Sequence, residues 1–170
     1  MLRSTERSTP SAAAPSPRSE GHDYRLFVEI PGPERGFDFW VGEWDVRRSD
    51  TDELVGRNSI IQLHGGRVLA ESYTTSSGGF SGSSLNGFDS ERGRWHQCWM
   101  DSAGLVLDLY GGVAGGEMVM CGENESGQSE RISWTPLADG SVRQHWQRSS
   151  DQGATWLTVF DGMYRRRAAT

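Results

Sequence analysis

Residues 94–101, Arg-Trp-His-Gln-Cys-Trp-Met-Asp, carry side chains at every second position that could bind or convert a small molecule. Successive side chains of an extended strand point to opposite faces. One face therefore carries Trp95, Gln97, Trp99 and Asp101, which join aromatic surface to an amide and a carboxylate. Small-molecule sites commonly combine apolar walls with a few polar groups, so this face predicts one wall of a binding cavity.

A second segment, residues 142–148, repeats part of this pattern, because Gln144 and Trp146 share one face. Buried amides must find hydrogen-bond partners or lose solvation free energy. Inward-facing glutamines therefore indicate a polar network or a ligand, although the tryptophans alone could simply be core. We expect Glu71, Tyr73 and Asn86 to complete the network. The candidate ligand-binding residues are Tyr73, Asn86, Gln97, Trp99, Gln144 and Trp146.

The same cavity could instead be catalytic. Burial would raise the pKa of Glu71 or Asp101, and either carboxylate could then act as a general acid or base. Gln and Tyr donors would stabilise an enolate-like oxygen, which suits a cofactor-free cyclase or isomerase. His96 and His145 are the alternative bases, although alternation places both outside when the glutamines face inward. A nucleophilic Cys98 paired with His96 is disfavoured, because side chains two residues apart on a strand are too far apart for an easy hydrogen bond.

Composition excludes several other functions. All seventeen basic residues are arginines, and the missing lysine removes Schiff-base chemistry, pyridoxal phosphate and the phosphate-loop motif. The net charge of −6 argues against nucleic-acid binding. No metal-ligand spacing or nucleotide loop occurs, so we expect no metal and no cofactor. The cysteines, Cys98 and Cys121, are predicted to be reduced, buried thiols.

The order of short segments predicts the architecture. Residues 1–23 are rich in Ser, Pro and Ala and are expected to form a disordered tail, followed by a single domain over residues 24–167. The chain lacks a secretory apolar segment and any bilayer-length run, which predicts a cytoplasmic protein with no membrane partner. A homodimer is left open. Ten strands are expected, over residues 44–49, 56–63, 67–74, 79–89, 94–101, 105–111, 117–122, 129–135, 142–148 and 155–164.

Tight, Gly-containing turns at residues 64–67 and 138–141 favour hairpins, whereas residues 111–116 read as a wider, flexible connection. Successive hairpins favour an all-β, antiparallel up-and-down barrel, whose closure removes exposed sheet edges. A helical turn before Gly42-Glu43-Trp44 would let Trp44 plug one end of that barrel, with its N–H on a backbone acceptor. The basic run at residues 165–167 is expected to be solvated.

Two resemblances follow from these residues. Residues 149–156, Ser-Ser-Asp-Gln-Gly-Ala-Thr-Trp, resemble the Asp-box hairpin of sialidases, which implies that Asp151 closes the last turn and that Trp156 packs beneath it. The Gly42-Glu43-Trp44 entry, the strand meander and the Arg-rich last strand resemble the lipocalin-like (calycin) superfamily. Residues 82–89 and 95–101 are also similar to uncharacterised bacterial domains of the DUF1579 kind.

The superfamily resemblance implies a cavity for a small apolar or aromatic molecule and an arginine, Arg165 or Arg166, packed over Trp44. The haem-binding nitrobindin branch has a proximal His near its last strands, where His145 stands here. Its longer Gly-rich motif is missing from this chain, so haem is not expected. Ligand binding is the first functional hypothesis, catalysis in the same cavity is the second, and a purely structural domain is the third.

Overall fold

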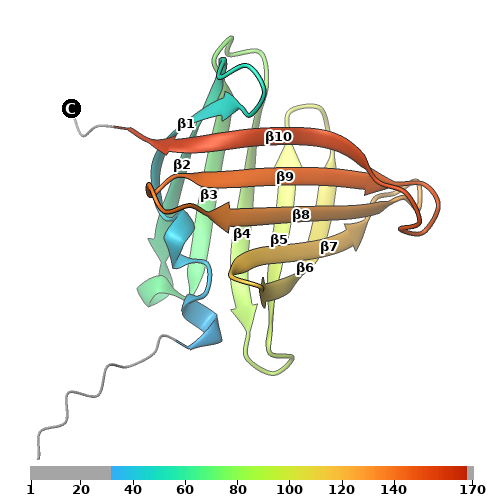
Figure 1. Ribbon diagram of the computed structural model, residues 1–170. Coiled ribbons are helices and arrows are strands. Elements are labelled where there is room, and N and C mark those ends of the chain that lie inside the picture. Colours follow the sequence, from blue (N-terminus) through green and yellow to red (C-terminus); the bar gives the residue numbers. More distant parts are fainter. Residues whose placement is uncertain (1–31, 168–170) are drawn as a thin grey trace, which may run out of the picture.

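The computed structural model describes residues 32–167, in which ten antiparallel strands form one closed barrel (Figure 1). The predicted tail, residues 1–23, and residues 24–31 of the predicted domain lie outside the described residues. The strands are β1 (Gly42–Arg48), β2 (Leu54–Leu63), β3 (Val68–Thr75), β4 (Ser81–Asp89), β5 (Arg94–Asp101), β6 (Val106–Ala114), β7 (Glu117–Glu123), β8 (Ser129–Pro136), β9 (Val142–Ser149) and β10 (Leu157–Arg166).

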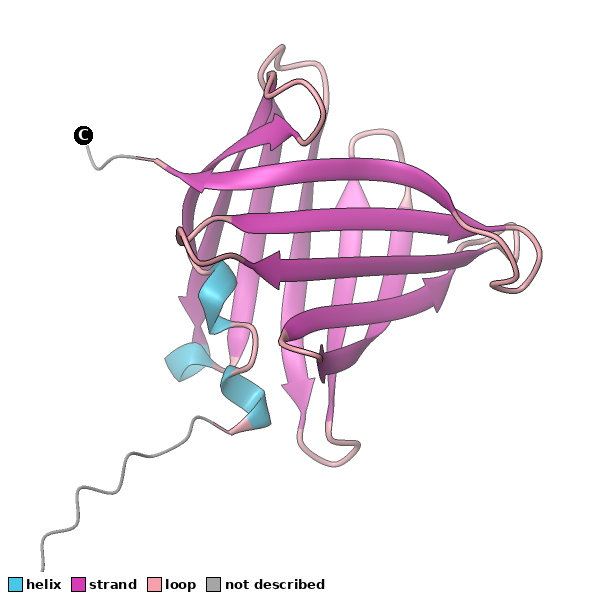
Figure 2. Ribbon diagram, viewed as in Figure 1, coloured by secondary structure: helices cyan, strands magenta, loops and turns pink. Residues whose placement is uncertain are grey.

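Each strand pairs with the next along the chain, and β10 closes the barrel against β1. The predicted all-β class, the up-and-down order and the number of strands are therefore confirmed. In Figure 1, β8, β9 and β10 cross in front of β2 to β5 at a steep angle. Three 3₁₀ turns, η1 (Pro33–Arg35), η2 (Asp38–Trp40) and η3 (His64–Gly66), lie together at one end of the barrel (Figure 2).

One predicted loop is wrong. Residues 111–116 were expected to form a wide connection, but β6 continues to Ala114 and the turn consists of Gly115 and Gly116, both at positive φ. Gly111 is paired with Met120 inside the sheet, and a Cβ at Gly111 would strike the backbone carbonyl oxygen of Val119. This glycine permits close approach of two strands, so a run of glycines did not mean a flexible loop here.

The entry to β1 is built around Trp44, which is fully buried. Its indole Nε1 donates a 2.8 Å hydrogen bond to the carbonyl oxygen of Trp40 at the end of η2. The Arg166 guanidinium lies 4.3 Å from the centre of the Trp44 ring and also donates to the carbonyl oxygen of Val41. The predicted helical turn, the backbone acceptor and the arginine over the ring are all confirmed, and Arg166 rather than Arg165 makes the cation–π contact.

Aromatic side chains fill this end of the barrel, which we call the closed end (Phe37, Trp40, Trp95 and Trp134). All four are buried. Phe37 stacks on Trp40 with ring centroids 4.8 Å apart, and it meets Trp95 and Trp134 edge to face at 5.7 and 5.1 Å. Aromatic pairs of this kind stabilise the fold by more than the burial of their surface alone. The closed end is therefore a packed core.

The last hairpin has the geometry that the Asp-box resemblance implies. The Asp151 carboxylate accepts hydrogen bonds from the backbone N–H and the hydroxyl of Thr155, at 2.8 and 2.6 Å. These bonds, together with one from the Ser149 hydroxyl, hold the pKa of Asp151 down at about 2. Trp156 turns back over the loop and donates to the carbonyl oxygen of Gly153 at 3.0 Å. The side chains of Asp151 and Trp156 therefore stabilise the turn that joins β9 to β10.

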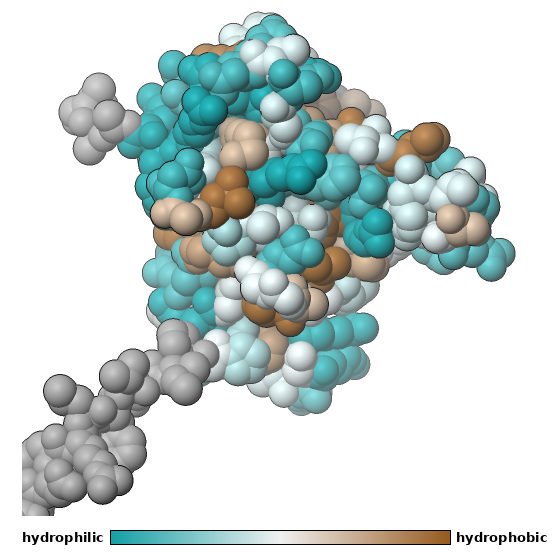
Figure 3. Space-filling view, viewed as in Figure 1, coloured by the Kyte–Doolittle hydropathy of each residue, from teal (hydrophilic) through white to brown (hydrophobic). Residues whose placement is uncertain are grey.

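The prediction of buried cysteines is wrong. Both thiols are free, but Cys98 is only half-buried and Cys121 is exposed. Cys98 lies between the inward-facing Gln97 and Trp99, and Cys121 follows the inward-facing Met120. Strand parity therefore places both thiols on the outer surface. That surface is mostly hydrophilic on the face seen in Figure 3, with apolar side chains scattered among polar ones. Within residues 32–167, no helix is long and apolar enough to cross a bilayer.

Candidate ligand cavity

The barrel interior is open in the half away from the closed end. A cavity of about 320 Å³ lies there, within the size range of small-molecule sites. Its aromatic lining residues are Tyr73, Phe80, Trp99, Trp146, Phe160 and Tyr164, its polar ones Glu71, Thr75, Gln97, Asp101 and Gln144, and its aliphatic ones Leu107, Ile132 and Val159. Val159 is 42% exposed, so the cavity meets solvent at the end where the loops at residues 76–80, 102–105 and 150–156 lie. We call this end the mouth.

Seven of the eight candidate site residues line this cavity, and strand parity is confirmed on β3, β5 and β9. The exception is Asn86 on β4, which is fully buried but does not line the cavity. Glu71 lies four residues along β3 from Thr75, which corresponds to a depth on the order of 13 Å below the mouth. A carboxyl group therefore lies in the cavity lining well below the mouth.

A chain of hydrogen bonds between buried side chains runs from Glu71 to Gln97. The Ser84 hydroxyl donates to Glu71 Oε2 at 2.6 Å, the Asn86 amide donates to Ser84 Oγ at 2.9 Å, and the Gln97 amide donates to Asn86 Oδ1 at 2.7 Å. Glu71, Ser84, Asn86 and Gln97 are all buried. Satisfied polar chains of this kind hold side chains in one arrangement, so the predicted network exists and Ser84 connects its members.

Asn58 on β2 extends the network across the barrel. Its amide nitrogen donates to Glu71 Oε1 at 2.7 Å and to the Tyr164 hydroxyl at 3.3 Å. The Tyr164 hydroxyl in turn donates to Oε1 of Gln144. The two predicted glutamines are therefore linked through Glu71. Asn58 Oδ1 has no hydrogen-bond partner among the described residues.

Glu71 is a carboxyl group buried without a cationic partner among the described residues. It is 6% exposed. Burial raises its pKa to about 7, although the hydrogen bonds from Ser84 and Asn58 act in the opposite direction. The pKa of the neighbouring Tyr73 is also raised, first by burial and then by the charge of Glu71. Near neutral pH, Glu71 can therefore both give and accept a proton.

Asp101 has a different environment at the mouth. Its Oδ1 accepts the backbone N–H groups of Ala103 and Leu105, at 2.9 and 3.1 Å, which closes the turn between β5 and β6. Its Oδ2 accepts the indole N–H of Trp99 at 3.1 Å. Asp101 thus fixes both the turn and the orientation of one aromatic wall, while its charge remains beside the cavity.

Three glycines make room for the aromatic walls. A Cβ at Gly56 would overlap the Tyr73 ring, and a Cβ at Gly82 would overlap the Trp99 ring. The same holds for Gly162 and the Phe160 ring. None of the three has a positive φ, so glycine is required here because a ring occupies the space of a Cβ, not because a turn requires it.

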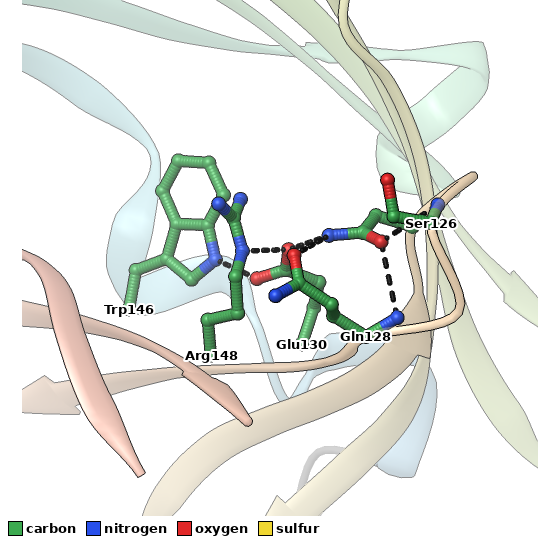
Figure 4. Close-up of polar contacts among 6 residues, drawn as sticks. Ser126, Gln128, Glu130, Trp146 and Arg148 are labelled. Carbon is green, nitrogen blue, oxygen red and sulfur yellow. Dashed lines mark hydrogen bonds and ion pairs between the residues drawn. The ribbon is translucent and has the colours of Figure 1, made fainter. Parts of the chain in front are cut away.

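Glu130 on β8 is a buried residue, bonded to a wall of the cavity, that sequence reasoning missed. It is fully buried and accepts hydrogen bonds from Trp146 Nε1 at 2.6 Å, Arg148 Nε at 2.6 Å and Asn124 Nδ2 at 2.9 Å (Figure 4). Arg148 also lies 5.8 Å from the Trp146 ring centre. Glu130 therefore positions the second aromatic wall. Alternation with Ile132 and Trp134 was the available signal that it faces inward.

The remaining candidate groups lie outside the barrel. His96 contacts Asp108 at 2.7 Å and stacks on Tyr110, and His145 bonds the hydroxyl of exposed Thr158 at 3.0 Å. Neither histidine lines the cavity, so neither can act as a base or as a haem ligand there. Within residues 32–167, no group of three or more His, Cys, Asp or Glu side chains is placed to hold a metal ion.

The fold and the cavity together define a ten-stranded antiparallel β-barrel with an open interior, an arrangement consistent with a lipocalin-like fold. Comparison with protein-family models finds no match to the chain, and a search of curated proteins finds no relative.

Proposed function

We propose that the protein binds a small apolar or aromatic molecule in the barrel cavity. The observation that carries this proposal is the contrast between the two ends. Four large aromatic side chains pack the closed end, whereas Trp99 and Trp146 are held against the walls by Asp101 and Glu130 and leave space of about 320 Å³ between the strands. Large side chains fixed around a space, with polar groups at its depth, are typical of ligand sites.

The lipocalin-like resemblance supports the same proposal, since that superfamily holds small apolar ligands inside its barrels. Membership of a DUF1579-like group is part of this proposal. Fold alone does not assign a ligand, so the proposal depends on the lining residues.

Native mass spectrometry of the protein purified from its own host, followed by denaturing extraction, tests this proposal. We expect a retained small molecule, or uptake of one from a set of one- and two-ring aromatic compounds. Val159→Trp narrows the mouth and should abolish retention. Val106→Trp is the matched control, because Val106 is similarly exposed at 46% but lies away from the cavity lining. A protein that retains nothing and takes up no compound of the set contradicts the proposal.

A second candidate function is proton transfer, as in a cofactor-free isomerase or cyclase. The buried Glu71 carboxyl group, with a pKa of about 7, favours it. For a β,γ-unsaturated ketone, the Glu71 carboxylate would remove the α-proton, polar donors would stabilise the enolate oxygen, and the same carboxyl group would return the proton to the γ-carbon.

Conversion of 3-cyclohexen-1-one into its conjugated isomer, followed by ultraviolet absorbance, tests the second function. Loss of the general base in Glu71→Gln should lower kcat/KM by about 100-fold or more. The exposed carboxylate variant Glu123→Gln should retain the wild-type rate. Equal rates for wild type and Glu71→Gln would rule out this role for Glu71.

A further inference from the structure

The charges around the cavity are unbalanced. Glu71 lies deep in the cavity and Asp101 lies at its mouth, and no Arg or His is among the described residues that line it. A cavity for a fatty acid or another anion needs a cation or several free N–H donors at the anionic group. This lining supplies two carboxyl groups instead, so an anionic ligand would meet like charges.

The nearest arginine does not change this balance. Arg148 lies beside Trp146, but its Nε donates to the fully buried Glu130 at 2.6 Å. The pair is a buried carboxylate with its own counter-ion (Figure 4), and it contributes no net charge to the cavity. Glu71 and Asp101 are therefore left as the unpaired charges of the lining among the described residues.

The aromatic rings of the lining point to the same ligand chemistry. The faces of aromatic rings carry negative electrostatic potential and attract cations, most strongly when the site is shielded from water. Tyr73, Phe80, Trp99 and Trp146 are four of the six rings around the cavity. Aromatic rings combined with carboxylates form the cages that recognise quaternary ammonium groups.

We infer that the ligand of this cavity is a small organic cation, an apolar or aromatic amine or quaternary ammonium compound, whose charge is balanced by Glu71 and Asp101. This inference rests on the proposed binding function and specifies the ligand class. The apolar body of the ligand contacts the aromatic walls, and its cationic group takes the place of the counter-ion that Glu71 lacks.

Binding of a cation should be coupled to loss of the proton from Glu71. Asn58 on β2 and Ser84 on β4 donate hydrogen bonds to Glu71, and Tyr164 on β10 belongs to the same network through Asn58. Of these only Tyr164 titrates, and burial together with the Glu71 charge raises its pKa well above its usual range, as burial raises that of Tyr73. Glu71 is thus the group that changes charge near neutral pH, and a bound cation favours its ionised form. Affinity for a cation should rise with pH through about 7.

Three probes of one shape and different charge test the inference: phenyltrimethylammonium, tert-butylbenzene and benzenesulfonate. Binding is followed by titration of the indole N–H nuclear magnetic resonance signals of Trp99 and Trp146, assigned with single Trp→Phe variants. We expect the cation to bind about tenfold or more tightly than the neutral probe at pH 8, and the anion not to bind. Because a quaternary ammonium does not titrate, its expected tenfold loss of affinity between pH 8 and pH 6 reports on the protein.

Variants of Glu71 and Asp101 test whether the two carboxyl groups cause the preference for the cationic probe. Glu71→Gln should remove the pH dependence and most of the preference for the cation over the neutral probe. Asp101→Asn should weaken cation binding without removing the pH dependence. Equal or tighter binding of the neutral probe overturns the inference and leaves the proposed binding function intact. If no probe shifts either indole signal, the inference and the proposed function both fail.

Discussion

Replacing Glu71 by Gln should make the protein more stable at neutral pH, although it removes a residue from a buried network. Glutamine keeps the length and shape of the side chain without its charge. Its amide can donate to Asn58 Oδ1 once the Asn58 amide rotates, and that oxygen has no partner among the described residues. The Ser84 hydroxyl, which donates to Glu71 Oε2 at 2.6 Å, keeps an oxygen acceptor if the glutamine carbonyl takes that place.

The expected size follows from the pKa of Glu71. Burial raises it to about 7 in the folded protein, from an ordinary value of 4.5. A group whose pKa is raised on folding stabilises the protein below the unfolded-state value, and this stability is lost as the pH rises through the folded-state value. At 1.36 kcal/mol per pH unit, the loss between pH 4.5 and pH 7 is about 3 kcal/mol. Glutamine cannot lose a proton, so the variant does not lose this stability.

Urea unfolding of both proteins in steps from about pH 4.5 to about pH 8.5 measures the effect. The free energy of unfolding of Glu71→Gln minus that of wild type should increase by about 3 kcal/mol over this range. All other groups are common to both proteins, and Glu123→Gln controls for the loss of one negative charge at an exposed position. A difference that stays constant with pH would refute the argument that Glu71 is a carboxyl group buried without a counter-ion.

Three further substitutions test other parts of the structure. Glu130→Ala removes the acceptor of three side-chain hydrogen bonds and should lower the free energy of unfolding by about 3 kcal/mol, measured by urea unfolding. Gly82→Val forces a side chain into the Trp99 ring and should cost about 1–3 kcal/mol, with a changed Trp99 indole N–H signal. Arg143 holds the pKa of Asp161 at about 2, so Asp161→Asn should be destabilising at neutral pH. Thermal unfolding measures this difference in stability between the variant and wild type. The difference should shrink as the pH falls from about 4 towards 2, because wild type then loses the same interaction.

Strand alternation was sufficient to predict the barrel and much of its lining. The period of two residues depends only on backbone geometry, so the inward faces of β5 and β9 could be assigned from Gln97, Trp99, Gln144 and Trp146. The same argument placed His96 and His145 outside. Assigning buried positions to Cys98 and Cys121 failed, because the usual burial of cysteine was given more weight than the parity of their strands.

The parts that were missed depend on pairing between distant strands. Asn58 and Ser84 connect Glu71 to the two glutamines, but only the register of β2, β3 and β4 brings them together. Alternation could have placed Glu130 on the inward face, but its partners Trp146, Arg148 and Asn124 lie on other elements. In β10 the register shifts between Thr158 and Phe160, so Val159 and Phe160 both line the cavity, which strict alternation does not allow.

A crystal structure of the protein purified from its own host tests most directly whether the barrel interior is a binding site. We expect electron density for an organic molecule in the cavity of about 320 Å³, in contact with Trp99 and Trp146, with a cationic nitrogen directed towards Glu71 or Asp101. A cavity that holds only water, or side chains of the lining collapsed into it, would contradict the claim that the barrel interior is a binding site.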